Sequence, residues 1–424
     1  MIENKVLVIA YYFPPMGLSG VQRTLKFVKY LPNYSWQPIV LTSNPRSYYA
    51  FDQTLLEEID GKDIEIFRTP RKKSKKGEDY KQVKFPSYLT QKMGRAFLQA
   101  FLQPDTKIRW KKAALRLGSE ILKKHDVKAI FATAPPFTDF LIAKELANAF
   151  QLPFIVDYRD IWVGNPFHFN ITPFHKVYAT NLEKEILTCA DTITVTTRHL
   201  KEHILKRYKF LTQEDVVVIS HGYDPEDFSF EEKIKQDPKK FTITHSGVFQ
   251  DDRTPVHFLK AFSNFLELKK GAKEHSFLKL IGVMRNEHIK LVKKLKLESN
   301  VNVTGYLSHK DAVKNLMDSD LLWLMLNDTA RSPGKLYEYF GAKKTLLITA
   351  PDGLMKRQAM ESKAAFCTAP NDIDAITKAL LELYDLWEQG KLPVPSDNFI
   401  KQFNRIELTG YLAKELSSLI DINS

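Results

Sequence analysis

Short apolar runs rich in β-branched residues recur along the chain, and longer segments of mixed polarity separate them. Such runs are typical of buried strands, while the segments between them have the length of helices. Strands that are apolar on both faces belong to parallel sheets covered by helices, so the pattern predicts an α/β fold. A first group of runs lies at 5–13, 37–43, 63–69, 129–135, 153–159, 192–197 and 216–220. A second group lies at 241–247, 277–282, 301–306, 321–326, 345–350 and 366–369.

These strands are too many for one sheet, and 424 residues are too many for one core, so we expect two doubly wound domains. The polar stretch from Asp224 to Lys240 has no apolar periodicity and separates the two groups. We assign the first domain to 1–228, a linker to 229–240 and the second domain to 241–397. The remaining segment, 398–424, holds a helix candidate whose apolar face is formed by Ile406, Tyr411, Leu412, Leu416, Leu419 and Ile420.

The composition is that of an ordinary globular protein, and it argues against a membrane-spanning helix and a disulfide framework. Hydrophobic residues make up 44% of the chain and charged residues 26%, which is ordinary for a globular protein. The sequence shows no apolar run near the roughly 18 residues that a membrane-spanning helix needs. The two cysteines, Cys189 and Cys367, imply neither a disulfide framework nor a cysteine metal site, and they favour a reducing cytoplasm.

The charge balance is basic, with 62 Lys+Arg against 50 Asp+Glu and a net charge of +12. Part of the excess lies in two segments, Arg71 to Lys84 and Lys107 to Lys112, of which the second includes Trp110. Each segment is either a solvated loop or a contact for nucleic acid, anionic lipid or a phosphorylated substrate. Between them, Phe85 to Leu102 carries apolar residues near helical spacing. That pattern suits a helix in a membrane interface or one packed on the first sheet.

Two strand-to-helix turns have features that suit an anion. Gly17 and Gly20 straddle the turn after the first run, where missing side chains let backbone N–H groups approach a phosphate or sugar. The spacing fits neither the dinucleotide fingerprint nor the P-loop, so a plain tight turn remains the alternative. Gly247 ends the first strand of the second group, and Arg253 precedes the next helix. Its guanidinium can bind a diphosphate bidentately, or it can pair with a neighbouring aspartate.

The segment "RSPGKLYEYFGAKKTLLITAP" (Arg331 to Pro351) lies between two apolar runs and is predicted to form a loop, a helix and a strand. Ser332 is a favoured N-cap, and Pro333 is a favoured first helical residue. Lys335 and Glu338 then share one face of the helix. They form either a weak surface pair or a site where a carboxylate accepts ribose hydroxyls and a cation holds phosphates.

Six motifs occur in the order expected of family 4-like glycosyltransferases of the GT-B fold, which the chain resembles over about residues 5–415. They are "PPMGLSGVQRTLKFVKYLP", "PFIVDYRDIW", "VVVISHGYDPEDF", "HSGVFQDDRTP", "VNVTGYLSHKD" and "SPGKLYEYFGAKKTLLI". The likeness is closest to bacterial enzymes of cell-surface polysaccharide assembly. It implies two Rossmann-like domains facing a cleft, the first for the acceptor and the second for the nucleotide sugar. It also implies a C-terminal helix that crosses back to the first domain.

The resemblance implies a hexosyltransferase that moves a sugar from a nucleoside diphosphate sugar, most commonly a UDP-sugar, to a saccharide or lipid-linked acceptor. Retention of anomeric configuration is expected. Because no D-x-D cluster is evident, neither a metal nor another cofactor is expected. A cytoplasmic protein is expected, at times peripheral at the inner face of an anionic membrane, with no nucleic-acid partner.

By the same resemblance, Gly17 matches the first glycine of a turn that faces the donor sugar and phosphate, and Leu18 replaces the second. Glu338 matches the last glutamate of the E-x7-E motif, which binds the donor ribose, whereas Ala330 replaces the first. Lys335 is expected to supply a compensating donor to the phosphate.

Further expected donor-site residues are Gly247, Arg253, Tyr306, Gly334 and Leu336, with Arg253 on the diphosphate and Tyr306 beside the nucleobase. Tyr306 either stacks on the base or is buried.

The acceptor side is expected near Asp160, where many relatives have a His-Asp pair and this chain has Arg159 before the aspartate. Asp160, Arg253 and Lys335 are thus the catalytic candidates. The alternative is an Arg159–Asp160 pair that closes a strand end. His221, in "SHGYD", is interpreted as a turn residue and not as a base.

Three other functions stay open. A nucleotide-sugar epimerase of the same fold would need catalytic acids and no acceptor site. A basic nucleic-acid-binding protein would interleave aromatic and basic residues on one surface. Finally, Leu18 and Ala330 are also compatible with an inactive scaffold of glycosyltransferase type.

Overall fold

The structure is a computed structural model of the whole chain, which folds into two compact units. Unit 1 comprises Met1–His221 and Arg405–Ser424, and unit 2 comprises Gly222–Asn404. The residues described are 4–44, 47–70, 81–82, 102–165, 172–230, 237–249, 253–329 and 333–421. Residues 71–80 and 83–101 lie outside this set, so it leaves out most of the first basic segment and the amphipathic segment that follows it.

Unit 1 is built on a parallel sheet of seven strands. Their spatial order is β4 (Glu65–Arg68), β2 (Trp36–Thr42), β1 (Asn4–Ala10), β6 (Val127–Ala134), β7 (Phe154–Tyr158), β8 (Thr192–Val195) and β9 (Val216–Val218). Its helices are α1 (Gln22–Tyr30), α2 (Thr54–Glu57), α4 (Lys111–Lys124), α5 (Thr138–Phe150), α6 (Pro173–Cys189), α7 (Arg198–Arg207) and α16 (Arg405–Asp421). Short 3-10 helices η1 (Leu31–Tyr34) and η2 (Ile108–Trp110) and a small ladder, β3 (Ser47–Tyr48) with β5 (Lys81–Gln82), complete the description.

Successive side chains of β1 pack into two different cores. Val6 and Val8 join the cluster that includes residues of α1 and α16, while Leu7 and Ile9 join the cluster on the opposite face with α4 and α5. All four are fully buried. Because side chains of a strand alternate between faces, burial on both sides requires the continuous apolar run that the sequence shows.

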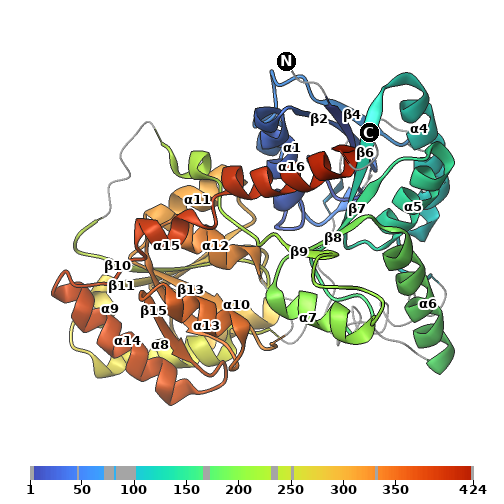
Figure 1. Cartoon of the computed structure of the whole chain (residues 1–424). Helices are drawn as coiled ribbons and strands as arrows, with labels where there is room; N and C mark the ends of the chain where they lie inside the picture. Colours follow the sequence, from blue (N-terminus) through green and yellow to red (C-terminus); the bar gives the residue numbers. More distant parts are fainter. Residues whose placement is uncertain are drawn as a thin grey trace. The chain divides into compact units, whose positions relative to one another are not determined.

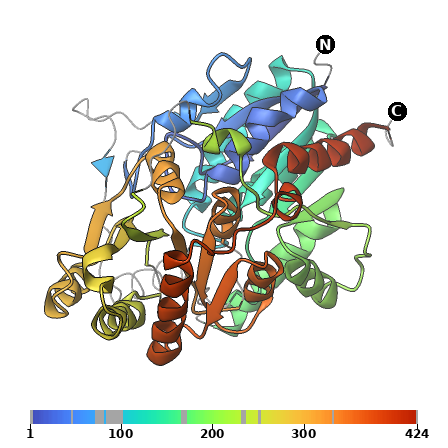
Figure 2. The same ribbon diagram turned by 90° about the vertical axis from the view of Figure 1, so that its left-hand side faces the viewer.

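Helix α16 packs on α1 within unit 1, as Figures 1 and 2 show. Trp36 Nε1 donates to Ser417 Oγ at 3.1 Å, and Leu412 and Leu416 are fully buried. The expected apolar face is wrong at Tyr411, which is 57% exposed. Its position lies one residue before Leu412, about 100° around the helix from the buried stripe.

Unit 2 has a parallel sheet of six strands. Their order is β12 (Val301–Gly305), β11 (Ser276–Ile281), β10 (Phe241–Ser246), β13 (Leu321–Met325), β14 (Thr345–Thr349) and β15 (Ala365–Thr368). Its helices are α8 (Val256–Leu268), α9 (Ala272–His275), α10 (Asn286–Lys294), α11 (His309–Met317), α12 (Gly334–Gly341), α13 (Leu354–Glu361), α14 (Ile373–Glu388) and α15 (Asp397–Lys401), with the 3-10 helix η3 (Pro225–Phe228).

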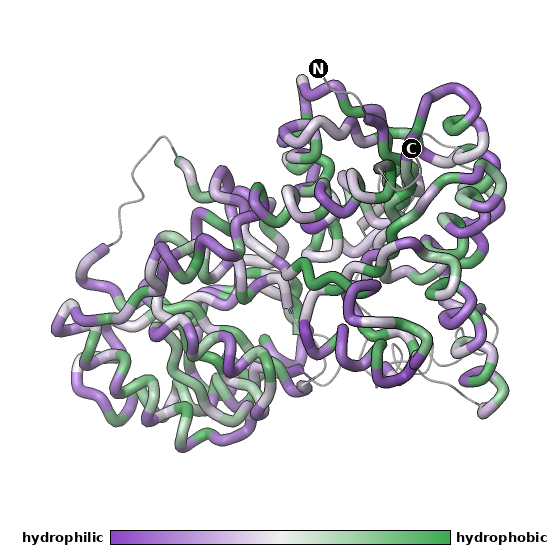
Figure 3. The backbone as a smooth tube through the Cα atoms, viewed as in Figure 1, coloured by the Kyte–Doolittle hydropathy of each residue, from purple (hydrophilic) through white to green (hydrophobic). Residues whose placement is uncertain are grey.

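Both faces of this second sheet are covered as well (Figure 1). Leu322 and Leu324 of β13 pack into the cluster that contains residues of α12 and α13, and Leu321 and Trp323 face the cluster of α8 and α14. Figure 3 shows the same division in each unit, with hydrophobic strands inside and hydrophilic stretches along the outer helices.

The predicted fold class is therefore confirmed: every apolar run of the sequence overlaps a strand of one of two parallel sheets. The division into units falls earlier than the predicted linker at 229–240, of which 231–236 lie outside the described residues. A Cβ at Gly341 would lie 2.6 Å from Tyr223 and 2.7 Å from Phe228. Residues 223–228 thus pack directly on α12, which accounts for their place in unit 2.

The second basic segment, Lys107 to Lys112, contributes Trp110 to the hydrophobic core of unit 1. Trp110 is 9% exposed, its Nε1 donates to Thr69 Oγ1 at 3.0 Å, and its ring meets Tyr11 edge-on. It is thus neither a membrane anchor nor a platform for stacked bases. No helix in the described part of the chain is both long and apolar enough to span a bilayer.

Candidate functional site

The candidate residues of unit 2 follow strands at the carboxyl edge of its sheet. Gly247 comes directly after β10, Tyr306 after β12, and Lys335 and Glu338 lie on the helix that follows β13. The strand order reverses between β10 and β13, which run side by side although β11 and β12 come between them in sequence. In open α/β sheets, ligands bind outside the carboxyl ends of strands at such a switch point.

Three glycines bring the backbones of β10, β11 and β12 close together at this edge. The Gly247 N–H donates to Ile281 O at 2.8 Å, and the Gly282 N–H donates to Gly305 O at 2.8 Å. A Cβ at Gly282 would lie 2.2 Å from Gly247 O, and the φ of Gly282 is 132°, so only glycine fits there. The result is a close approach of the backbones at the carboxyl ends of these strands.

On α12, Lys335 Nζ and Glu338 Oε2 are 2.7 Å apart. Glu338 is only 8% exposed. Burial by itself raises the pKa of its carboxyl, but the charges of Lys335 and His309 outweigh that effect and hold the pKa below its ordinary value. Glu338 is therefore an ionised carboxylate at neutral pH.

His309 and Asp227, which the sequence analysis did not single out, also affect the pKa of Glu338. His309 is the first residue of α11, and its Nε2 lies 2.9 Å from Asp227 Oδ2 of η3. Ser308 caps α11, accepting from the Asp311 N–H at 3.1 Å. The signal was present in "YLSHKD": a serine cap after a strand places the next residue, a histidine, at a helix start on the ligand edge.

The positive charges of Arg253 and Lys335 both lower the pKa of His245, which lies two residues before Gly247. Burial and these two positive charges lower the pKa of His245 to about 4, although its hydrogen bond with Trp323 O opposes the shift. The imidazole is thus neutral, and it is stacked on Phe249 with ring centroids 4.5 Å apart. The two cations consequently lie near one strand end. Asp251 and Asp252, the alternative partners of Arg253, lie outside the described residues.

Other predictions around α12 need adjustment. The helix begins at Gly334 with Pro333 as N-cap, one residue later than predicted, because Pro333 has an extended ψ of 130°. Leu336 is fully buried in the apolar core and its N–H donates to Pro333 O at 3.2 Å, so we leave it out of the donor site. Tyr306 is partly buried, and Ala330 and Ser332 lie outside the described residues.

The predicted residues of unit 1 also lie at the carboxyl edge of their own sheet. Gly17 is buried and its N–H donates to Ala50 O at 2.9 Å. Leu18 has a φ of 69°, a left-handed conformation that costs a non-glycine residue about 1–2 kcal/mol. The turn therefore keeps a backbone conformation that favours glycine, even though the residue is leucine.

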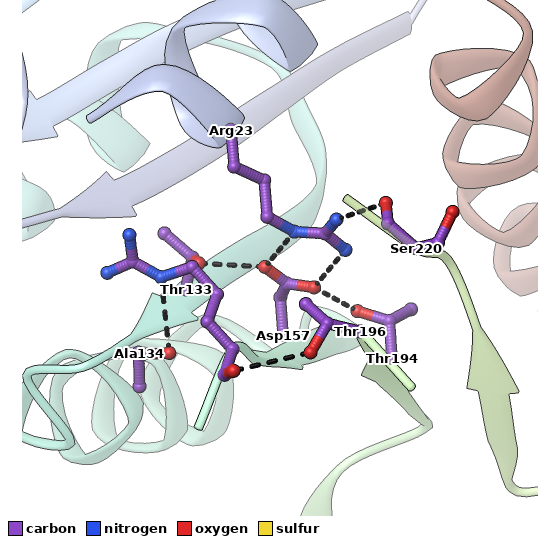
Figure 4. A network of polar contacts seen from close by, with 8 residues as sticks. Arg23, Thr133, Ala134, Asp157, Thr194, Thr196 and Ser220 are labelled. Carbon is purple, nitrogen blue, oxygen red and sulfur yellow. Dashed lines mark hydrogen bonds and ion pairs between the residues drawn. The ribbon is translucent and has the colours of Figure 1, made fainter. Parts of the chain in front are cut away.

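A buried ion pair joins α1 to the centre of the unit 1 sheet (Figure 4). Arg23 donates from Nε and Nη2 to both oxygens of Asp157, at 2.9 and 2.8 Å. The same carboxylate accepts from the hydroxyls of Thr133 and Thr194, each at 2.8 Å, and Arg23 Nη1 donates to Ser220 O at 2.8 Å. This network, which the sequence did not predict, joins α1, β6, β7, β8 and the segment that follows β9.

Arg159 contacts backbone carbonyls, and the charge of Asp160 also acts on its guanidinium. Its guanidinium donates to the backbone carbonyls of Gly20, Ala134 and Pro135. These hydrogen bonds connect the segments that follow β1 and β6. Asp160 is partly buried next to it. Burial and the charges of nearby arginines hold the pKa of His221 well below its ordinary value, so this histidine is neutral.

A cavity of about 520 Å³ lies at the opposite, amino edge of the unit 2 sheet. Its two lysines are already paired, Lys279 with Asp318 at 2.7 Å and Lys240 with Asp237 at 2.9 Å. It contains none of the predicted site residues.

Comparison with solved structures identifies the fold. A glycosyltransferase from Rickettsia africae ESF-5 aligns over 99% of both chains with a TM-score of 0.63 and 16% identity. Sucrose-phosphate synthase from Thermosynechococcus elongatus covers 99% of this chain and 100% of its own, with a TM-score of 0.67 and 11% identity. Anabaena HepE in complex with UDP-glucose covers 98% and 100%, with a TM-score of 0.64 and 12% identity. The fold is that of GT-B glycosyltransferases.

Sequence comparison matches part of the chain to a family model. Residues 226–393, nearly all of unit 2, match the family model described as glycosyl transferases group 1. A comparison with curated protein sequences finds no significant match. The partial family match and the fold both agree with the expected glycosyltransferase of GT-B type.

Proposed function

We propose that this enzyme moves a sugar from a nucleoside diphosphate sugar to a saccharide or lipid-linked acceptor, with retention and without a metal. The observation that carries the donor assignment is the Lys335–Glu338 pair, 2.7 Å apart at the carboxyl edge of the unit 2 sheet. One ionised carboxylate beside cations at a switch point matches the two parts of a nucleotide, its ribose and its diphosphate.

Each residue then has a distinct task. Glu338, ionised at neutral pH, accepts hydrogen bonds from the ribose hydroxyls. Arg253 and Lys335, whose charges both act on His245, bind the diphosphate.

The same cations serve the reaction. As the bond between the sugar and the diphosphate breaks, negative charge develops on the leaving oxygen, and Arg253 and Lys335 stabilise it. In a retaining transfer the acceptor hydroxyl attacks from the face that the diphosphate leaves, and the departing phosphate takes the hydroxyl proton. Asp160, at the edge of the unit 1 sheet, is the candidate contact for the acceptor.

UDP is the proposed nucleotide. The support is that Anabaena HepE, which shares the fold at 12% identity, was crystallised with UDP-glucose. A thermal-shift panel of nucleoside diphosphates and their sugars tests the choice, because a ligand at 100 times its Kd adds about 2.7 kcal/mol of stability. We expect UDP and one UDP-sugar to raise the melting temperature most. A panel without any shift would contradict the proposal.

The reaction type has its own test. Incubation with the UDP-sugar selected by the panel and a membrane extract of the producing cell should release UDP and label a saccharide or lipid-linked product. Conversion of the nucleotide sugar into an isomer, without UDP release, would instead support an epimerase.

Association with an anionic membrane surface is the proposed route to a lipid-linked acceptor. Its support is the basic composition, with 62 Lys+Arg in the chain, and salt should weaken such binding. Co-sedimentation should therefore be stronger with anionic than with neutral liposomes, and it should fall at high salt. Equal sedimentation with both liposomes would contradict this route.

A further inference from the structure

The sheet of unit 1 has a switch point of its own, between β1 and β6. These strands are neighbours although β2 and β4 come between them in the sequence and lie on the other side of β1. In open α/β sheets, ligands bind outside the carboxyl ends of the strands at such a point. Tyr11 follows β1 at this edge, and Thr138, the first residue of α5, lies in the segment after β6. A ligand of unit 1 is therefore expected between these two strand ends.

Lys107, the first residue of the second basic segment, lies at this switch point. Its backbone N–H donates to Asp105 Oδ1 at 2.8 Å, and Asp105 also accepts from the N–H and the hydroxyl of Thr138, each at 2.9 Å. The Lys107 ammonium lies over the rings of Tyr11 and Tyr12, with Nζ 5.0 and 5.9 Å from their centroids. The lysine is thus connected to the end of β1 by its side chain and to the end of β6 through Asp105.

Tyr11, on whose ring the ammonium rests, is held by three kinds of contact. Its N–H donates to Asp139 Oδ2 at 2.8 Å, and its carbonyl accepts from the Ser43 hydroxyl at 2.9 Å. Its ring meets Trp110 edge-on, with centroids 5.2 Å apart. Trp110 belongs to the hydrophobic core and lies three residues after Lys107. The aromatic surface beneath the ammonium is therefore fixed by the core of unit 1.

The Lys107 ammonium forms no ion pair with any residue that the structure describes, although the side chain is partly buried. Burial lowers its pKa from the ordinary 10.5, and the charge of Asp105 opposes that shift. A partly buried cation without an ion-pair partner is costly, and the faces of two aromatic rings offset only part of the cost. A ligand that carries negative charge would supply the partner.

Two carboxyl groups near Lys107 bear on this choice of ligand. The Asp105 carboxylate is already stabilised by the N–H groups of Lys107 and Thr138 and by the Thr138 hydroxyl. Burial raises the pKa of the Asp139 carboxyl well above its ordinary value, which favours the uncharged form. The charge of Asp105 still weakens the attraction for an anion, so the anion must contact the ammonium directly.

We propose that Lys107 binds an anionic group of the acceptor, a phosphate or a carboxylate, at the switch point of unit 1. This inference rests on the proposed function. It goes beyond it by assigning a charge to the acceptor and a task to the second basic segment. Asp160, the other candidate contact for the acceptor, follows β7, which is the neighbour of β6 in the sheet. Lys107 selects the acceptor, and it takes no part in breaking the bond between the sugar and the diphosphate.

The test is the rate of sugar transfer at saturating UDP-sugar and increasing amounts of a membrane extract of the producing cell. Lys107→Met keeps an apolar stem beside the tyrosine rings and removes the charge. It should raise the amount of extract needed for half of the maximal rate about tenfold, the usual scale for a charged hydrogen bond, and change the maximal rate less. The melting temperature and the calorimetric affinity for UDP should stay as in wild type.

Two matched variants separate charge from shape. Lys107→Arg keeps a positive charge at the same position, so its half-saturation with extract should stay closer to wild type than that of Lys107→Met. Lys112→Met removes an exposed lysine of the same segment and should leave half-saturation unchanged.

Soluble sugars distinguish the two sources of negative charge. Glucose 1-phosphate carries a phosphate, methyl glucuronide carries a carboxylate, and methyl glucoside is the neutral reference. The anionic sugar that matches the acceptor should inhibit wild type more strongly than methyl glucoside does. More extract should relieve this inhibition, whereas more UDP-sugar should not. In Lys107→Met the advantage over methyl glucoside should disappear.

Three results would overturn the inference while the proposed function stands. They are an unchanged half-saturation in Lys107→Met, an equal change in Lys107→Arg and Lys107→Met, and equal inhibition of wild type by all three sugars. Wild-type protein that transfers no sugar from any UDP-sugar to the extract would instead overturn the proposed function itself, and the inference with it.

Discussion

Lys335 Nζ lies 2.7 Å from Glu338 Oε2, across one turn of α12 at the carboxyl edge of the unit 2 sheet. An exposed pair at this spacing would contribute only a few tenths of a kcal/mol. Here the Glu338 carboxylate is buried, and the charges of Lys335 and His309 lower its pKa. The carboxylate therefore stays ionised although little water reaches it. The carboxylate that we propose for the ribose is held by a neighbouring cation in this structure.

Arg253→Ala should separate phosphate binding from nucleoside binding. The guanidinium is expected to touch only the diphosphate, so the affinity for UDP should fall by about 1.5–3 kcal/mol while the affinity for uridine stays nearly unchanged. Calorimetry with both ligands measures the difference. Lys260→Ala, an exposed lysine on α8, is the control. Equal losses for uridine and UDP would indicate a folding defect and not a phosphate contact.

Asp157→Asn should destabilise unit 1 strongly. The carboxylate is fully buried and accepts from Arg23, Thr133 and Thr194, so the variant leaves the Arg23 charge uncompensated. Removing one partner of a buried pair costs about 3–5 kcal/mol of unfolding free energy. Urea denaturation measures it. Asp126→Asn, whose side chain is 81% exposed, should cost less than about 0.5 kcal/mol. A loss below about 1 kcal/mol for Asp157→Asn would show that the network is not a stability anchor.

Glu183 should make the stability of unit 1 depend on pH. Burial raises the pKa of its carboxyl to about 7 even though the Tyr208 hydroxyl donates to it at 2.6 Å. Because the folded pKa exceeds the ordinary value of 4.5, this contribution is fully present below pH 4.5 and is lost as pH rises through 7. The loss should reach about 3 kcal/mol.

Glu183→Gln isolates that effect, because an amide keeps the hydrogen bond with Tyr208 but does not titrate. The stability of the variant relative to wild type should increase between pH 4.5 and 7 and level off above it, as measured by denaturation at each pH. A difference that does not change with pH would rule out Glu183 as the titrating group.

Gly282→Ala should destabilise unit 2 at the carboxyl ends of β10 and β11. Its Cβ would lie 2.2 Å from Gly247 O at a φ of 132°, so β10 and β11 must separate, and we expect a loss above about 3 kcal/mol. Gly390 also has a positive φ, of 64°, but nothing lies within 4 Å of its Cβ position. Gly390→Ala should therefore cost only about 1 kcal/mol. Similar losses for the two variants would mean that the close approach at Gly282 is unimportant.

The strands were predictable because each needs a local apolar run, and every such run became a strand. The Lys335–Glu338 pair was predictable for a similar reason, since a spacing of three positions within one helix places both side chains on the same face. Tyr411 was misplaced because an aromatic residue suits either the buried or the exposed side of a helix, and only the packing of α16 on α1 decides.

Contacts between distant segments were not predictable. Arg23 and Asp157 are 134 residues apart, and Asp227 and His309 are 82 apart. No periodicity links such pairs, because they meet only after the sheet has assembled. The N-cap at Pro333 also escaped prediction, since proline suits both the cap and the first helical position and only its observed ψ distinguishes them.

The central claim is that Glu338 binds the ribose of a nucleoside diphosphate sugar, and titration of Glu338→Ala with UDP tests it most directly. Loss of a charged hydrogen-bond acceptor should weaken UDP binding by about 1–3 kcal/mol. Glu382→Ala, an exposed glutamate on α14, should bind as wild type does. Unchanged UDP affinity in Glu338→Ala, in a protein that still melts as wild type does, would contradict the account.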